Sequence, residues 1–296
     1  MDKKRLLILS AWTLMLLVSD LPDILWKTFE GRIPEPLFWA KVGLLSICLA
    51  LCFFWKRARP LRPYVFVLFV FFLALGVSTW VGKMFWWISR FGGPKFSFMN
   101  GYLEFYLRDT GVALAVIAAL WILKRRRRGF FLVKGDLGAP IEPVRWLGIR
   151  KGESWRQFGW IFAFVAGLSV LIPTLLSLHL SKGALSRAAL LLPAVLLFAA
   201  VNAFNEEVYY RSSFLTTLKD VLGKNHTLMI SSVFFGMAHY LYGSPPGVIG
   251  FLMTGFLAWL MGKSMLETKG FFWAWFIHFV PDVVIFASYA INWVRG

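Results

Sequence analysis

A series of long apolar stretches constrains the fold of this chain more than any other feature of its sequence. A helix that crosses the hydrocarbon core of a bilayer needs about 20 mostly apolar residues. Because lipid offers no hydrogen-bond partner to the backbone, we expect an all-α fold, a polytopic transmembrane helical bundle of about 8–9 spans. The candidate spans are Leu6–Trp26, Leu37–Trp55, Tyr64–Met84, Phe105–Leu123, Phe158–Leu180, Ala188–Phe204, Leu228–Tyr242, Gly247–Met261 and Phe271–Trp293.

Composition and charge support an integral membrane protein and argue against nucleic acid binding. The chain is 58% hydrophobic and only 16% charged, whereas charged residues make up about 25% of a soluble domain. Its net charge is +17, but the basic residues cluster in short segments between the apolar stretches. Most of these segments fall on the side of the N-terminus, so the positive-inside rule predicts a cytoplasmic N-terminus. The compact loops and basic segments favour a bacterial inner membrane.

The segment 129–157 is the best candidate for a domain boundary, because it is rich in glycine, proline and charge. It predicts an N-terminal four-span membrane block at 1–128 of unknown role, a cytoplasmic linker at 129–157 and a C-terminal core at 158–296. Further along, the turn residues between Gly243 and Gly247 predict that the apolar stretches on either side form an antiparallel helical hairpin.

Two adjacent carboxylates, Glu206 and Glu207, end the apolar stretch that begins at Ala188. Ionisable residues in or beside a spanning helix usually face a protein interior or a wet cavity, and they suggest a functional site. On a helix, Glu207 and Arg211 share a face and can pair. Glu206 is rotated away from them and shares its face with Asn202, so the two carboxylates are expected to have different roles. A surface salt bridge at a helix end is the alternative interpretation.

Two histidines, His239 and His278, lie well inside apolar stretches, where only a partner within the bundle can satisfy them. Gly236 precedes His239 and allows another helix to approach closely. His278 is followed one helical turn later by Asp282. A structural hydrogen bond between these two side chains is the alternative to a chemical role. Elsewhere, Arg108 and Asp109 are expected to pair or to extend to the membrane interface.

One unpaired carboxylate, two histidines and one aspartate are the groups that a hydrolase needs. A carboxylate and a histidine can hold and deprotonate water, and a second histidine with a hydrogen-bonding partner can stabilise an oxyanion. The same groups are also candidate zinc ligands, since two histidines and a carboxylate leave one position for water. The spacing does not decide between the two, so a metal site remains open, with Glu206, His239, His278 and Asp282 as its candidate ligands.

Three short motifs occur in one order and on separate predicted spans: Glu206-Glu207-x-x-x-Arg211, Phe235-x-x-x-His239 and His278-x-x-x-Asp282. Together they resemble the CPBP family of intramembrane proteases, the CAAX prenyl protease and bacteriocin-processing (Abi-like) family. This family includes the type II CAAX prenyl endopeptidases. The resemblance covers roughly Trp146–Trp293.

The resemblance implies that Glu206 activates a water with help from His239, and that His278 with Asp282 stabilises the oxyanion. Glu207, Arg211 and Phe235 would be supporting residues. It favours a glutamate-type mechanism that requires no cofactor, with zinc as the alternative. Because an ionised aspartate cannot donate to an oxyanion, Asp282 is expected to be protonated, to orient His278 or to bind a metal.

The resulting hypothesis is an intramembrane endopeptidase that acts on a membrane-anchored protein or peptide substrate at the lipid bilayer. Two alternatives remain. The first is a non-catalytic binding or immunity protein of the same fold. The second is a proton-coupled transporter that uses the same buried glutamates and histidines.

Overall fold

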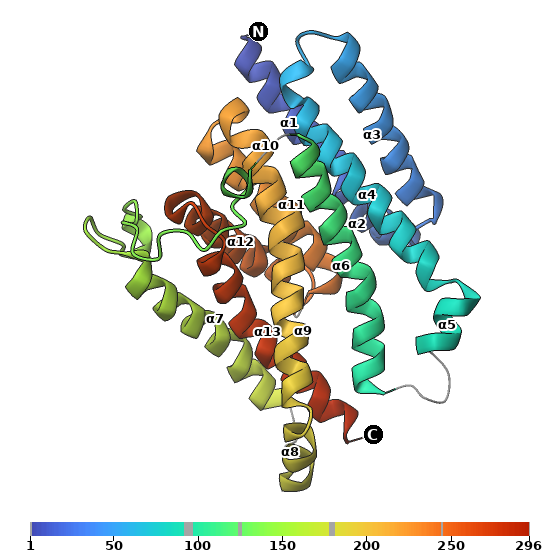
Figure 1. Cartoon of the computed structure of the whole chain (residues 1–296), viewed down its shortest axis with the longest axis vertical. Helices are drawn as coiled ribbons and strands as arrows, with labels where there is room; N and C mark the ends of the chain where they lie inside the picture. Colours follow the sequence, from blue (N-terminus) through green and yellow to red (C-terminus); the bar gives the residue numbers. More distant parts are fainter. Residues whose placement is uncertain (1, 92–96, 124–125, 178–180, 244, 296) are drawn as a thin grey trace.

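The computed structural model describes residues 2–91, 97–123, 126–177, 181–243 and 245–295, and this part of the chain is built from packed α-helices (Figure 1). The helices are α1 (Lys3–Val18), α2 (Leu21–Glu30), α3 (Pro36–Phe54), α4 (Arg62–Gly82), α5 (Phe85–Phe91), α6 (Phe98–Ile122), α7 (Trp155–Ser177), α8 (Lys182–Ala189), α9 (Leu192–Glu206), α10 (Ser213–Leu222), α11 (Lys224–Tyr242), α12 (Val248–Thr268) and α13 (Phe272–Trp293). Single turns of 3-10 helix are η1 (Arg59–Leu61), η3 (Arg127–Phe130) and η4 (Arg145–Leu147), and η5 (Glu207–Ser212) is a π-helix.

The helices agree with the predicted polytopic bundle. Among the described residues, 6 helices are long and apolar enough to cross a membrane, or up to 8 if each bent helix pair forms one span. One bent pair is α1 with α2, at 45°, and the other joins α8 to the helix that starts at Leu192, at 65°. The predicted stretch Leu228–Tyr242 is helical as part of α11, but the polar start of that helix keeps it outside this set. The chain is therefore an integral membrane protein.

Local sequence explains where several of these helices begin and end. The Ser97 side chain accepts a hydrogen bond from the backbone N–H of Asn100 and so caps the start of α6. Ser181 caps α8 in the same way. At the end of α2, Gly31 adopts φ 73°, a left-handed conformation that glycine takes without steric cost. Each of these residues satisfies backbone groups that a helix end would otherwise leave unpaired.

Helix α6 lies between α4 of the N-terminal block and α9 of the C-terminal half. Helix α6 packs against α4 on one side and against α9 on the other, and α13 packs against both α7 and α9 (Figure 1). The two ends of the chain lie at opposite ends of the molecule. Helices α11 and α12 pack along each other, which agrees with the predicted helical hairpin. A helix of the predicted N-terminal block therefore contacts the helix that ends at Glu206.

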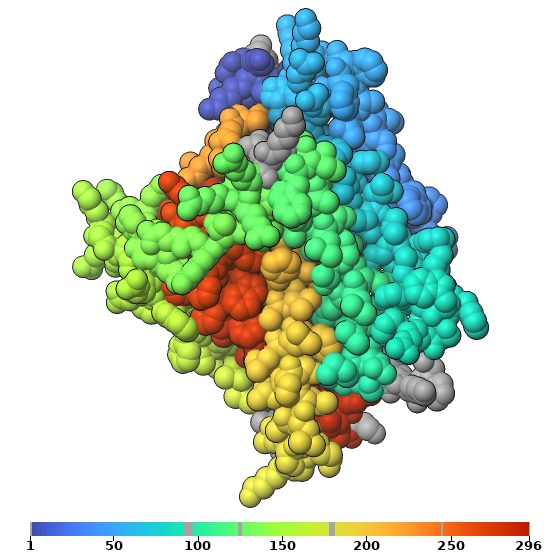
Figure 2. Space-filling view, in the orientation of Figure 1, coloured from blue at the N-terminus to red at the C-terminus, as the bar shows by residue number. Residues whose placement is uncertain are grey.

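The segment between α6 and α7 is packed onto the C-terminal helices and forms much of the face seen in Figure 2. Its backbone bonds to the turn between α12 and α13, through Asp136 N to Thr268 O at 2.8 Å and Phe271 N to Val133 O at 2.8 Å. The two segments approach each other so closely that a Cβ on Gly135 would lie 2.6 Å from the Cα of Gly270. Whether 129–157 separates two domains stays a prediction, but its first half is ordered against the core.

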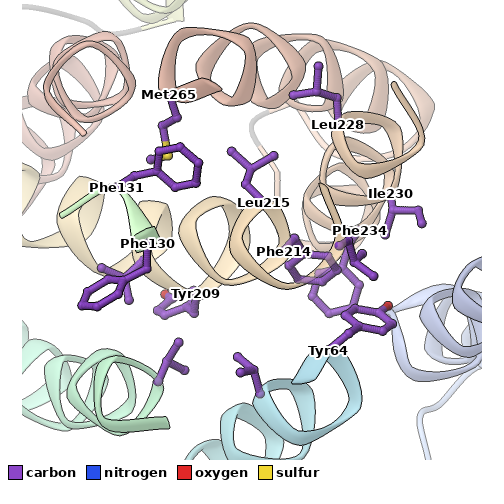
Figure 3. Packing of buried hydrophobic residues seen from close by; sticks show 14 of the residues in the cluster. Tyr64, Phe130, Phe131, Tyr209, Phe214, Leu215, Leu228, Ile230, Phe234 and Met265 are labelled. Carbon is purple, nitrogen blue, oxygen red and sulfur yellow. The ribbon is translucent and has the colours of Figure 1, made fainter. Parts of the chain in front are cut away.

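The largest buried cluster surrounds α10 and joins helices from both halves of the chain. Figure 3 shows Phe214 of α10 beside Tyr64 of α4 and Phe234 of α11. The rings of Phe214 and Phe234 lie 5.1 Å apart, and Phe214 meets Tyr64 edge-on at 5.6 Å. Aromatic pairs at such distances add to the stabilisation from burial. This cluster fixes α10, and with it the η5 segment that carries Glu207 and Arg211.

Candidate active site

The backbone changes from α-helix to π-helix directly after Glu206. Helix α9 ends at this residue, η5 follows from Glu207 to Ser212, and one continuous helical segment reaches Leu222. A π-helical turn contains an extra residue, and such turns occur frequently at functional sites. The sequence spacing predicted a regular α-helix here, and no residue pattern indicated the π-helix. The extra residue changes the direction in which Glu206 and Glu207 point relative to α10.

Arg211, Glu207 and His278 form a connected chain of buried side chains. Arg211 Nε donates to Glu207 Oε2 at 2.9 Å, and its Nη2 contacts Glu207 Oε1. Both side chains have 0% exposure. Glu207 Oε1 in turn lies 2.8 Å from His278 Nδ1. A carboxylate only accepts, so His278 Nδ1 is the donor and its ring orientation is fixed. The predicted pairing of Glu207 with Arg211 is present, deep inside the protein and not at a helix surface.

The other ring nitrogen of His278 faces two carboxylates. Its Nε2 lies 3.5 Å from Glu206 Oε2 and 3.7 Å from Asp282 Oδ2. Neither contact is among the hydrogen bonds of the described residues, so the structural bond considered between His278 and Asp282 is not made. Glu206 Oε2 is buried and has no hydrogen-bond partner among the described residues. A buried oxygen of this kind is a site where a water or a substrate group binds.

Asp282 receives a hydrogen bond from a different residue. Asn202, one turn before Glu206 on α9, donates from its Nδ2 to Asp282 Oδ2 at 2.9 Å. The predicted helix face of Asn202 and Glu206 therefore points toward α13. Helix α13 continues through Pro281 without ending, and it presents His278 and Asp282 on one face.

His239 lies in the last turn of α11 and lines the same cavity as Glu206, His278 and Asp282. Its Nδ1 is 3.0 Å from the carbonyl oxygen of Phe235, so Nδ1 donates and Nε2 is left without a proton in the neutral ring. The Phe235 ring lies 4.3 Å from the ring of His239. On the Phe235 ring, the Arg211 guanidinium makes a cation–π contact, 3.9 Å from the ring centroid. Phe235 thus separates His239 from the buried ion pair, and no ion pair joins His239 to Glu206 within 4 Å.

Helix α12 approaches α11 closely beside His239, as the small residue Gly236 led us to expect. A Cβ on Gly236 would lie 2.8 Å from the carbonyl oxygen of Phe251. The absence of a side chain at this position therefore allows the close contact between α11 and α12.

These groups line one end of a cavity of about 820 Å³. Its remaining wall is largely aromatic and comes from α5, α6 and the C-terminal half of α13, including Trp87, Tyr102, Phe105, Phe286 and Tyr289. A mostly apolar cavity with a few convergent polar groups is the usual form of a ligand site. The cavity therefore combines chemistry from the C-terminal helices with a wall from the N-terminal block.

Helix α6 also contributes to this site, which the sequence motifs did not predict. The Tyr106 hydroxyl donates to Asn202 Oδ1 at 3.1 Å, and Asp109 accepts from Asn205 Nδ2 at 2.8 Å. Arg108 pairs instead with Glu104 at 2.7 Å. Arg108 and Asp109 are both paired, as expected, but Asp109 points into the bundle. The available signal was an aspartate three residues after a tyrosine within an apolar stretch, which places both on one helix face.

The described residues contain no group of three or more His, Cys, Asp or Glu side chains arranged to hold a metal ion. The Nδ1 of His239 is occupied by a carbonyl, and that of His278 by Glu207. These bonds leave Nε2 of each ring facing the cavity, and a histidine that binds a metal usually donates its other ring nitrogen in this way. The zinc alternative therefore remains a prediction that chelation can test.

Fold and site together define an integral membrane protein whose helices enclose a cavity with paired carboxylates and histidines. Residues 188–284 match the family described as type II CAAX prenyl endopeptidase Rce1-like. The match covers about a third of the chain, and it agrees with the resemblance drawn from the three motifs. No curated protein and no solved structure matches the chain.

Proposed function

We propose that this protein is an intramembrane endopeptidase that hydrolyses a peptide bond of a membrane-associated protein or peptide with a water activated by Glu206. The observation that carries the proposal is the buried Oε2 of Glu206, which has no hydrogen-bond partner among the described residues and faces a large cavity beside His278. The Rce1-like domain at 188–284 supports a protease as the class of enzyme.

In the proposed reaction, a water bound to Glu206 Oε2 gives its proton to this carboxylate while its oxygen attacks the carbonyl carbon of the substrate. His239 Nε2 accepts the second hydrogen of that water in a hydrogen bond and orients it. The C–N bond then breaks, and the proton held by Glu206 passes to the leaving nitrogen. The products are a carboxylic acid and an amine, so atoms and charges balance.

The negative charge on the carbonyl oxygen needs a donor, and His278 is the proposed one. Its Nδ1 donates to Glu207, so an imidazolium ring has Nε2–H left to donate to the oxyanion. Glu207 and Arg211 act through His278 by fixing its ring. Asp282 carries no direct bond to His278, and its proposed role is electrostatic and positional.

The substrate is proposed to enter from the membrane or from its cytoplasmic face. The aromatic wall of the cavity suits an apolar segment next to the scissile bond. The orientation with a cytoplasmic N-terminus, and the assignment to a bacterial inner membrane, rest on the distribution of basic residues.

The test is cleavage of a library of membrane-anchored and prenylated peptides by the purified protein in detergent. Wild type is compared with Glu206→Gln, which keeps the size of the side chain but removes its basicity, and with chelator-treated wild type. We expect Glu206→Gln to lose at least about 100-fold in kcat, the lower range for a general base, and chelator to leave the rate unchanged.

Loss of activity in both samples would favour the metal-dependent alternative. Equal rates in wild type and Glu206→Gln would contradict the proposal. The non-catalytic binding protein and the proton-coupled transporter would then be the remaining hypotheses, and a gradient-dependent flux in proteoliposomes would distinguish between them.

A further inference from the structure

We propose that Tyr106 of α6 is a positioning residue for the reaction, acting through Asn202 to hold Asp282 away from His278. This inference rests on the proposed function of the same cavity. Tyr106 lies outside residues 188–284, the segment that matches the Rce1-like family. The N-terminal part of the chain would thus supply a functional element and not only a wall for the cavity.

Two consecutive hydrogen bonds connect α6 to α13 through α9. The Tyr106 hydroxyl donates to Asn202 Oδ1 at 3.1 Å, and Asn202 Nδ2 donates to Asp282 Oδ2 at 2.9 Å. All three side chains line the cavity that contains Glu206 and His278. The hydroxyl of Tyr106 is therefore connected through two hydrogen bonds to the Asp282 carboxylate, which lies next to the reacting groups.

The Tyr106 hydroxyl holds the Asn202 amide in the orientation that Asp282 requires. An amide group has an oxygen that accepts and a nitrogen that donates, and an ionised carboxylate only accepts. Asn202 must turn its nitrogen to Asp282, which leaves its oxygen for Tyr106. Without the hydroxyl, the amide oxygen loses its donor from α6, and the Asn202 side chain is held only through its bond to Asp282.

The orientation of Asn202 matters because Asp282 has a second available partner. Asp282 lies one turn after His278, and its Oδ2 is 3.7 Å from His278 Nε2, just beyond hydrogen-bond distance. Asn202 holds that oxygen in place. If Asp282 were released, a small movement would let it accept the Nε2 proton, which the proposed mechanism reserves for the oxyanion.

A second set of contacts joins α6 to α9 one helical turn further along. Asn205 Nδ2 donates to Asp109 Oδ2 at 2.8 Å and to Thr110 Oγ1 at 3.2 Å. The Tyr209 hydroxyl also donates to Asp109, at 3.3 Å. Because these bonds keep α6 against α9, loss of the Tyr106 hydroxyl alone should leave the helix packing intact. The effect of that change can therefore be attributed to Asn202 and Asp282.

The test measures kcat and KM for Tyr106→Phe, Asn202→Ala and the double variant, with the peptide substrate that wild type cleaves. We expect Tyr106→Phe to lower kcat about 10-fold, the change that corresponds to one hydrogen bond, with KM unchanged because the ring still lines the cavity. Asn202→Ala should lower kcat at least as much. The double variant should match Asn202→Ala, because both changes break the same chain of bonds.

Tyr64→Phe is the matched control. Tyr64 is a buried tyrosine of α4 in the N-terminal block, and its hydroxyl has no hydrogen-bond partner among the described residues. Removal of this hydroxyl should leave kcat and KM at wild-type values. A thermal unfolding curve for each variant shows whether the folded fraction is unchanged.

Three results would overturn the inference. They are a wild-type kcat for Tyr106→Phe, a loss of rate that only follows a loss of folded protein, and effects that multiply in the double variant. If Glu206→Gln is inactive while Tyr106→Phe is fully active, only the role of Tyr106 is wrong. If Glu206→Gln is also fully active, the proposed function fails, and the role of Tyr106 fails with it.

Discussion

Replacement of Arg211 by methionine tests how far the buried ion pair supports both the fold and the site. Arg211 and Glu207 have side chains with 0% exposure, so the substitution leaves a buried carboxylate without its arginine and with only the His278 ring beside it. Removing one partner of a buried ion pair typically costs about 3–5 kcal/mol. Arg211 also lies 3.9 Å over the Phe235 ring, and the loss of that contact adds to the cost. We expect Arg211→Met to be destabilised by at least about 3 kcal/mol.

The double variant Glu207→Gln with Arg211→Met separates the cost of the unpaired charge from the loss of packing. Glutamine is neutral, and its side-chain oxygen can still accept from His278 Nδ1. We expect this variant to recover most of the lost stability, because replacement of a buried pair by groups of similar volume is often neutral. Unfolding of the detergent-solubilised protein by heat or denaturant provides the measurement.

The pair Glu104 and Arg108 provides a matched control with the same spacing on a helix. These side chains are 21% and 19% exposed, so the pair is only partly buried, and a fully exposed pair contributes only about 0.2–1 kcal/mol. Arg108→Met should therefore cost far less than Arg211→Met. Equal losses in the two variants, or a double variant no more stable than Arg211→Met, would refute the argument that burial makes the Glu207 charge costly.

Two further predictions concern packing and pH. Gly159→Ala should destabilise the protein by about 1–3 kcal/mol, because its Cβ would lie 2.3 Å from the Trp273 ring. Gly111→Ala, where a Cβ meets nothing within 4 Å, should be neutral or slightly stabilising in the same unfolding assay. The hydrogen bond from Lys224 lowers the pKa of Glu142 below its usual value. This hydrogen bond adds a small stabilisation that is present above the pKa of glutamate in the unfolded chain, about 4.3. The stabilisation is lost as the pH falls through the lower pKa of Glu142 in the folded protein. In Glu142→Gln, this part of the acid-induced loss of stability should be absent.

The sequence alone determined the class of fold and most of the groups in the site. Spanning helices follow from stretches of apolar residues, because lipid leaves the backbone no other partner. The same cost of burying charge made Glu206, Glu207, His239, His278 and Asp282 stand out within or beside those stretches. Helical spacing also predicted the pairing of Glu207 with Arg211, since side chains four residues apart share a face.

Tertiary structure decided which partners these groups have. The 2.8 Å contact of His278 with Glu207 joins residues 71 positions apart, and no local pattern specifies a contact at that separation. The entry of Tyr106 and Asp109 into the site depends on how α6 packs against α9, and no sequence pattern indicated the π-helix at η5. Local spacing fixes only which residues share a helix face. Which face meets which neighbour is a property of the packed bundle, and this packing brings Tyr106 to the polar end of the cavity.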